Sequence, residues 1–236
     1  MKIPKVLRQH LIIEPICVLW RPKENGQKIL KNKIANKKFV YLISPNKIKS
    51  KFFYKDLEKL FKTKKISFFQ LRLKKNTPKE KLIIGKKINR ICKKYEVKFI
   101  VNDDPALARK LNSDGCHLGQ KDMEISDARK ILRNKIIGIT CHNSIALVKK
   151  AVKNKANYIA IGAFNASKTK KVKFRSNIKL LKLVKKITNL PVVAIGGINN
   201  INYKNLLLNK ANFLAISGYI WKNKKYKPVE AINSLK

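Results

Sequence analysis

Acidic residues are scarce in this chain of 236 residues. Asp and Glu together number 13, against 56 Lys and Arg, and the formal net charge is +43. So basic a chain raises the question of nucleic acid or an anionic membrane as a partner. The lysines are spread over nearly every segment, however, alongside many Asn and Ile, and these residue types share AT-rich codons. We therefore attribute the composition to codon bias rather than to polyanion binding, and we expect the positive field to attract small phosphorylated substrates.

Cysteine is also sparse, and the spacing of the cysteines does not match a metal site. The four cysteines are Cys17, Cys92, Cys116 and Cys141. No C-x-x-C pair occurs and no His lies at zinc-ligand spacing from them, which argues against a zinc site. Reduced and mostly buried thiols in a cytoplasmic protein are therefore expected.

Long hydrophobic runs are missing as well. No apolar run reaches the length of a transmembrane helix. The apolar stretch at residues 11–20 is broken by Glu14 and Pro15, and no small-residue cleavage site follows it. We therefore expect neither a membrane span nor a secretory signal.

From residue 39 onward, short apolar runs rich in β-formers alternate with longer Lys-rich segments that carry apolar residues at helical spacing. The runs predict eight strands, near residues 39–43, 66–71, 98–101, 114–118, 136–140, 157–161, 191–195 and 212–216. Helices are predicted near residues 53–63, 79–95, 104–111, 124–133, 144–154, 176–187, 200–208 and 227–235. This alternation predicts an α/β fold, a single-domain (β/α)8 TIM barrel over residues 38–236. The main rival is a doubly wound open sheet, but no G-x-G-x-x-G follows the first strand. Residues 1–37 form an N-terminal extension of unknown role.

Polar residues follow the predicted strands, where a barrel of this kind builds its active site. Gln70, Arg72 and Lys74 alternate along the second strand and beyond it, so their side chains share one side of the extended chain. Asp103 follows the third strand and Asp122 follows the fourth. Because acids are so rare here, two acidic positions at adjacent strand ends indicate a hard cation, Mg²⁺, that carries phosphate oxygens.

Some polar residues at strand ends have a structural explanation. Asp104, which precedes a proline, is predicted to cap the following helix, and Ser144 to cap another. A nucleophilic pair of Cys141 and His142 is disfavoured, because neighbours on extended backbone point to opposite sides.

A second anion site is predicted around the last strands. The loop at residues 162–170 carries two hydroxyls and a lysine that could hold an oxyanion. Glycine is rare, nine residues in all, yet Gly196, Gly197 and Gly218 follow the seventh and eighth strands. Loops at this place in barrels often bind phosphate through backbone N–H groups. An enzyme that joins two phosphorylated molecules would need both sites.

Taken in order, these motifs resemble the thiamin-phosphate synthase family over about residues 38–236. They lie at residues 70–74, 102–103, 117–122, 137–142, 162–170, 194–198 and 216–218. The resemblance implies a Mg²⁺-dependent transferase. Such an enzyme joins hydroxymethylpyrimidine diphosphate to hydroxyethylthiazole phosphate, or to its carboxylated form, through a dissociative carbocation-like step that releases pyrophosphate.

The resemblance also implies the roles of individual residues. Arg72, Lys74 and Lys170 would be catalytic, and Asp103 and Asp122 would hold Mg²⁺. The pyrimidine diphosphate would contact Gln70, Leu71, Arg72, Leu73, Lys74, Asn102, Thr140 and Lys170. The thiazole phosphate would contact Ser167, Thr169, Gly197, Ile216 and Ser217. The chain departs from the family at Asn165, Ala166 and Ser167, where Phe, Pro and Thr are usual. The hydroxyl of Ser167 is expected to keep its contact, and the effect of these changes on activity is open.

Two alternatives stay open. A thiazole tautomerase, from the same superfamily, would use His142 as its acid–base residue, but it would leave the predicted diphosphate and metal residues without a role. A nonenzymatic basic barrel could bind polyanions, although no basic stripe interleaved with aromatics is found. The expected partners are therefore small phosphorylated molecules, with no membrane and no nucleic acid, and homo-oligomer formation is undecided.

Overall fold

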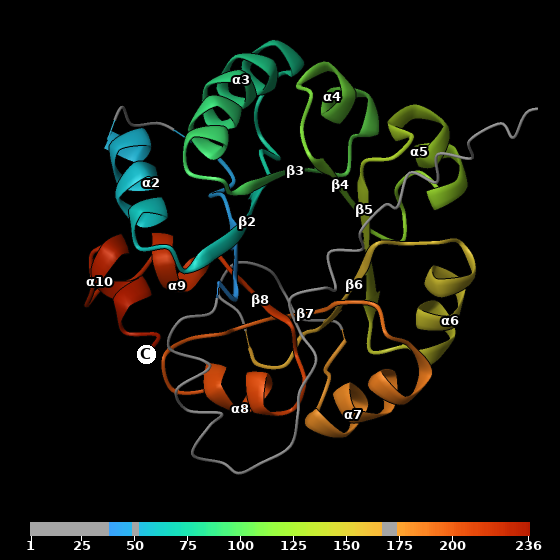
Figure 1. The fold of residues 1–236 in the computed structure, drawn as a ribbon. Coiled ribbons are helices and arrows are strands. Elements are labelled where there is room, and N and C mark those ends of the chain that lie inside the picture. Colours follow the sequence, from blue (N-terminus) through green and yellow to red (C-terminus); the bar gives the residue numbers. More distant parts are fainter. Residues whose placement is uncertain (1–37, 49–51, 167–173) are drawn as a thin grey trace, which may run out of the picture.

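The structure is a computed structural model that describes residues 38–48, 52–166 and 174–236. Its eight parallel strands close into a barrel, in which each strand pairs with the next and β8 pairs with β1. Helices surround this barrel on the outside (Figure 1). The (β/α)8 fold predicted from the sequence is thereby confirmed. The N-terminal extension lies outside the described residues.

The elements fall close to their predicted positions. The strands are β1 (Val40–Ile43), β2 (Ile66–Leu71), β3 (Lys98–Asn102), β4 (Gly115–Leu118), β5 (Ile136–His142), β6 (Tyr158–Gly162), β7 (Val192–Ile195) and β8 (Phe213–Ile216). The helices are α2 (Phe52–Lys62), α3 (Pro78–Lys94), α4 (Pro105–Lys110), α5 (Ile125–Leu132), α6 (Ile145–Lys153), α7 (Ile178–Ile187), α8 (Tyr203–Leu208), α9 (Gly218–Trp221) and α10 (Pro228–Asn233). The short helix α9 was not predicted.

At the amino end of the barrel, a polar side chain directly precedes each of β4, β6 and β8. These residues are Asp114, Asn157 and Asn212. Each side chain accepts a hydrogen bond of 2.8 Å from a backbone N–H near the start of the preceding strand. Each also donates its own backbone N–H to the carbonyl of that same residue. We call these three contacts the Asx clamps; they fix the register of three strand pairs.

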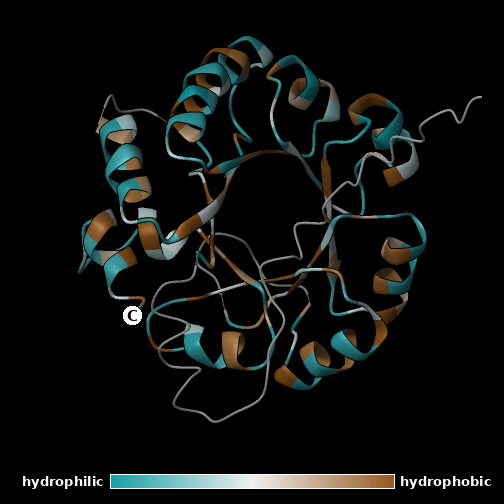
Figure 2. Ribbon diagram, in the orientation of Figure 1, coloured by the Kyte–Doolittle hydropathy of each residue, from teal (hydrophilic) through white to brown (hydrophobic). Residues whose placement is uncertain are grey.

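The helices are amphipathic: hydrophobic and hydrophilic residues alternate along them (Figure 2), and their hydrophobic residues are the buried ones, as in α2, α3 and α7. The large core cluster between sheet and helices includes Leu57, Phe69 and Ile88. Asp104 caps α4 by accepting from the Leu107 N–H at 2.9 Å, and Ser144 caps α6, as predicted. No helix among the described residues has the length and apolarity needed to cross a membrane.

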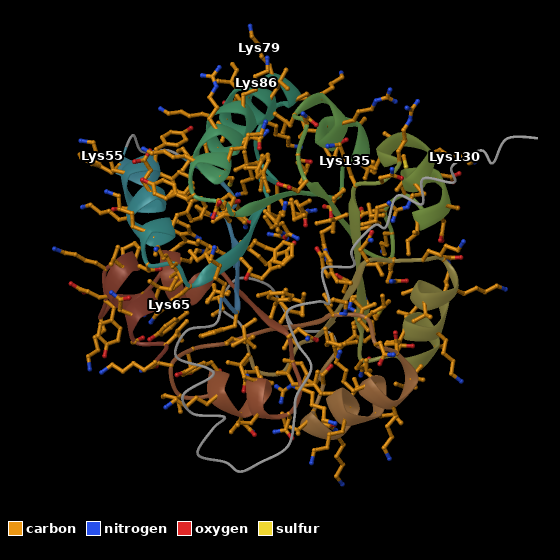
Figure 3. The ribbon with its side chains drawn as sticks, in the orientation of Figure 1. Lys55, Lys65, Lys79, Lys86, Lys130 and Lys135 are labelled. Carbon is orange, nitrogen blue, oxygen red and sulfur yellow. The ribbon has the colours of Figure 1, made fainter. Side chains whose placement is uncertain are left out.

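The outside of the barrel carries most of the positive charge. Lys55, Lys79 and Lys130 extend from the outer rim (Figure 3). Only five ion pairs join residues within the described ranges. Most basic residues of the described ranges therefore have no acidic partner there.

A second core cluster fills the barrel interior and includes Tyr41, Phe68, Ile100, Tyr158 and Val193. Gly138 makes room for one of these rings, because a Cβ at this position would lie 1.9 Å from the Tyr158 Cζ. The interior is therefore packed rather than open. Any substrate must bind above it, at the carboxyl ends of the strands.

Candidate functional site

The carboxyl ends of β2, β3 and β4 bring three charged side chains together. Lys74 follows β2, and its ammonium forms an ion pair with the Asp103 carboxylate. Asp103 follows β3 in a left-handed conformation with φ of 65°, and its backbone N–H donates to the carbonyl of His117 at 2.8 Å. Asp122 follows β4 and accepts from the Gly119 N–H at 2.6 Å.

The carboxyl groups of Asp103 and Asp122 lie close enough for each to affect the pKa of the other. Burial and the neighbouring Asp103 charge raise the pKa of Asp122, although the Gly119 N–H opposes this shift. Burial is the largest single influence on the pKa of Asp103 and raises it, but the hydrogen bond and charge of Lys74, together with Asp122 and His117, outweigh burial, so this pKa is lowered. The two carboxyl groups therefore influence each other's protonation. A divalent cation between the carboxylates would relieve their repulsion, so the pair fits Mg²⁺.

A protein cage for a metal is not complete. Among the described residues, no group of three or more His, Cys, Asp and Glu side chains could hold a metal ion. The two carboxylates would therefore supply part of a coordination sphere, with water or substrate oxygens as the remaining ligands. Mg²⁺ is usually bound in this way, through one or two carboxylates together with phosphate oxygens.

Beneath this cluster, hydrogen bonds link five side chains across the barrel interior. Gln70 Nε2 donates to Tyr41 Oη at 3.1 Å, and Tyr41 Oη lies 2.8 Å from Tyr158 Oη. Tyr158 Oη lies 2.9 Å from His117 Nδ1, and His117 Nε2 lies 2.8 Å from Thr140 Oγ1. We call this series the Gln70–Thr140 chain. Burial lowers the pKa of His117 to about 4, against the opposing charge of Asp103, so the imidazole is neutral at pH 7.

Thr140 is held from a second side, because the Gln120 amide donates to its backbone carbonyl. This contact ties the loop that carries Asp122 to the end of β5. Asn102, at the end of β3, is partly exposed beside these groups. Both predicted diphosphate residues therefore stand at the same end of the barrel as the acidic pair.

Arg72 is held by the loop after β1. Its guanidinium donates to the Asn46 side chain, and its backbone N–H donates to Ser44 Oγ at 2.8 Å. Ser217 Oγ in turn donates to the Ser44 carbonyl at 3.4 Å. The ends of β1, β2 and β8 are thus joined around Ser44.

Three predicted contact residues point away from the site. The side chains of Leu71, Leu73 and Ile216 are at most 5% exposed and pack in the core between sheet and helices. Only their backbone atoms could meet a substrate.

On the opposite side of the barrel mouth, backbone conformation dominates. Gly196 and Gly197 have φ of 108° and 56°, a region that favours glycine. A Cβ on Gly197 would lie 2.2 Å from the Ala166 carbonyl oxygen. The loop after β6 thus packs closely against the turn after β7. The predicted residues Ser167, Thr169 and Lys170 lie outside the described residues.

His142 ends β5 beyond a register shift in its pairing with β6, and its φ is 51°. Its ring packs against that of Phe174, with centroids 4.5 Å apart and planes at 34°. The neighbouring Cys141 is fully buried, and burial raises the pKa of its thiol to about 12. Burial and the raised pKa both disfavour a thiolate nucleophile at Cys141 at neutral pH.

Several residues of the site were not predicted: Tyr41, Ser44, Asn46, Gln120 and Tyr158. The hydroxyls of both tyrosines lie within apolar strands, where the sequence pattern indicates only core. Ser44 and Asn46 directly follow the first strand, so their position alone could have marked them.

Comparison with known proteins agrees with this geometry. A family model described as thiamine monophosphate synthase matches residues 40–220. The chain is 70% identical over 205 residues to a thiamine-phosphate synthase of Pelagibacter ubique, a match that covers 87% of this chain and 99% of the relative. It is 36% identical to a thiamine-phosphate synthase of Erythrobacter litoralis, covering 81% of this chain and 92% of that one. A solved thiamine phosphate pyrophosphorylase of Pyrococcus furiosus superposes with a TM-score of 0.73 at 25% identity, covering 85% of this chain and 95% of the other.

Proposed function

The chain belongs to the thiamine monophosphate synthase family, and we propose that the residues at the carboxyl ends of its strands carry out the family's reaction. Its activity is that of a thiamine-phosphate synthase, a transferase. The proposed substrates are hydroxymethylpyrimidine diphosphate and hydroxyethylthiazole phosphate or its carboxylated form. The observation that supports this assignment best is the cluster of Lys74, Asp103 and Asp122 at adjacent strand ends.

The proposed pyrimidine diphosphate subsite lies over β2, β3 and β5. Gln70 faces the aminopyrimidine, and the diphosphate is bound by Arg72, Lys74, Asn102, Thr140 and Lys170. Charged donors bind phosphate oxygens strongly because both partners of the hydrogen bond carry charge. The same donors gain strength as the leaving pyrophosphate develops negative charge, which lowers the barrier to breaking the C–O bond.

In this proposal Asp103 and Asp122 hold Mg²⁺, and the metal, when bound, neutralises charge on the pyrophosphate oxygens. Lys74 already lies beside these carboxylates, so its ammonium is placed to donate to the same phosphate group. Asp103 is fixed by its backbone hydrogen bond to His117, and Asp122 by its bond from the Gly119 N–H. These contacts fix the Asp103 backbone and the Asp122 carboxylate in place at adjacent strand ends.

The thiazole phosphate is proposed to bind on the other side of the mouth. Its phosphate would meet the backbone N–H groups around Gly197, Ile216 and Ser217, and its ring would meet Ser167 and Thr169. The C–O bond of the pyrimidine diphosphate breaks first, and its electron pair leaves with pyrophosphate. The thiazole nitrogen then donates its lone pair to the carbocation and forms the new C–N bond. No protein nucleophile is needed, and close positioning of the two fragments supplies much of the rate.

The test is pyrophosphate release by the purified protein, given both substrates, with and without Mg²⁺. We expect release to require both substrates and the metal, and to be lost in Asp103→Ala. Asp127→Ala is the matched control, because Asp127 pairs with Lys130 at 2.8 Å on the outside of α5. Equal activity in the two variants would contradict the proposed metal site. No release by the folded wild-type protein would overturn the substrate assignment.

We further infer a cytoplasmic location for the chain. Cys92, Cys116 and Cys141 are free and buried, and reduced thiols are usual in that compartment. No nucleic acid or membrane partner is proposed, because the substrates alone account for the charged groups of the site.

A further inference from the structure

The Gln70–Thr140 chain joins two residues that the proposed mechanism uses through three that it does not. Tyr41, Tyr158 and His117 belong to β1, β6 and β4, and all three are at most 8% exposed. The two end residues contact different parts of one proposed substrate, the pyrimidine at Gln70 and the diphosphate at Thr140. The intervening hydrogen bonds are 2.8 to 2.9 Å long.

Assigning one hydrogen to each hydroxyl and to the neutral imidazole shows which group donates at each hydrogen bond of this chain. Tyr41 Oη accepts from Gln70, so its own hydrogen points to Tyr158 Oη. The Tyr158 hydrogen then points to His117 Nδ1, and the imidazole carries its hydrogen on Nε2, toward Thr140. The Thr140 hydroxyl hydrogen is left over. A reversed link would leave a buried tyrosine hydrogen without an acceptor among the described residues, which is costly.

In this direction the two ends present complementary groups. Gln70 keeps its carbonyl oxygen and one remaining N–H for a ligand, an acceptor beside a donor. Thr140 keeps one O–H, a donor. An aminopyrimidine offers an amino donor beside a ring-nitrogen acceptor, and a diphosphate offers only acceptors. Both ends therefore match the proposed substrate at the same time.

We propose that the Gln70–Thr140 chain couples the two ends of the subsite, so that an aminopyrimidine is selected over an oxopyrimidine that carries the same diphosphate. An oxopyrimidine offers a carbonyl acceptor beside a ring N–H donor, the opposite pattern. Gln70 would have to turn its amide over, and every hydrogen of the chain would then reverse. Thr140 would present lone pairs to the diphosphate instead of a donor. Tyr41, Tyr158 and His117 act here as positioning residues. The inference rests on the proposed function.

The test compares kcat/KM for the aminopyrimidine diphosphate with that for its 4-oxo analogue, in the presence of thiazole phosphate and Mg²⁺. We expect the wild-type protein to prefer the amino substrate by a factor on the order of 10³ or more, as for sites built around buried hydrogen-bond partners. Tyr158→Phe cuts the chain without touching either end residue. We expect the preference to fall at least about tenfold in this variant, as expected when one buried link is lost.

Tyr95→Phe is the matched control, because Tyr95 follows α3, away from the chain, and its hydroxyl bonds only weakly to Glu58 at 3.5 Å. Its preference should equal that of the wild type. Tyr41→Phe cuts the chain at another link and serves as the test if Tyr158→Phe does not fold. A second readout is the coupling between Gln70→Met and Thr140→Val, which should be non-additive in the wild-type background and additive with Tyr158→Phe.

Three outcomes are distinguishable. A reduced preference together with lost coupling supports the proposal. An active wild-type protein whose preference is unchanged in the variant with the cut chain overturns the coupling but leaves the proposed function intact. A folded wild-type protein that releases no pyrophosphate from the aminopyrimidine diphosphate overturns both.

Discussion

On one side of the barrel mouth, at the ends of β2 to β5, the polar groups are side chains: Lys74, Asp103, Asp122 and Thr140. On the other side, at the ends of β7 and β8, the exposed polar groups are mainly backbone, shaped by Gly196 and Gly197. The first side depends on charge and on protonation. The second depends on the absence of side chains. Substitutions on the two sides should therefore reduce activity for different physical reasons.

The largest loss of activity is expected when Lys74 is replaced. Lys74→Gln removes the ammonium beside Asp103, and we expect kcat for pyrophosphate release to fall by about 10² to 10³-fold, as when one donor to a developing anion is removed. Lys150→Gln is the control, because its ion pair with Glu124 at 2.8 Å has similar exposure but lies on α6. Lys74→Arg should restore part of the rate. Equal losses in Lys74→Gln and Lys150→Gln would contradict the special place of Lys74.

The side of the barrel mouth at the ends of β2 to β5 should also make the stability of the protein depend on pH. Because burial lowers the pKa of His117 from 6.5 to about 4, the unfolded chain binds a proton more readily in that interval. Stability from this residue is present above pH 6.5 and is lost as the pH falls toward 4, by about 3 kcal/mol in all. Urea unfolding of wild type and His117→Gln at several pH values measures the difference. Parallel stability curves for the two proteins would be inconsistent with a buried neutral imidazole.

The backbone-dominated side, at the ends of β7 and β8, is tested by Gly197→Ala. The left-handed φ and the 2.2 Å contact with the Ala166 carbonyl oxygen mean that a methyl group must displace the loop. We expect KM for thiazole phosphate to rise about tenfold and stability to fall by about 1 to 3 kcal/mol. Gly85→Ala is the control, since Gly85 lies in α3 and its new Cβ would meet the flexible side chain of Leu111, directly after α4. Gly85→Ala should lose stability with KM unchanged. A raised KM in Gly85→Ala would mean that the KM effect is not specific to Gly197.

The smallest effect is expected at His142. Its ring packs on that of Phe174, with centroids 4.5 Å apart. His142→Asn should change kcat by less than about threefold, because no proton transfer is assigned to this residue. A loss of several orders of magnitude would instead favour the tautomerase chemistry that the sequence left open.

Much of the fold could be predicted because the strands are apolar runs between helices with clear spacing. The eight strands fell within a residue or two of their predicted bounds, and Asp104 was separated from Asp103 as a helix cap. Helix α9 was missed because it has only four residues, too few for a periodic pattern.

The site was only partly predictable. Charged residues at strand ends stand out in a sequence, so Lys74, Asp103 and Asp122 were predicted, and the structure places them at the ends of adjacent strands. Tyr41 and Tyr158 were not, because 117 residues separate them and only barrel closure brings their hydroxyls together. Interior hydrogen bonding depends on the register of several strands at once, which no local pattern contains.

The Asx clamps at the amino end bear on the order in which the barrel assembles. Each clamp closes a loop of only 15 to 20 residues, between β3 and β4, β5 and β6, or β7 and β8. Short loops cost little chain entropy, so each pair can find its register independently. Joining β8 to β1, where the Leu214 N–H donates to the Phe39 carbonyl, spans nearly the whole barrel. The clamps therefore favour local formation of these three strand pairs, and we expect closure of the barrel to be the slow, long-range step.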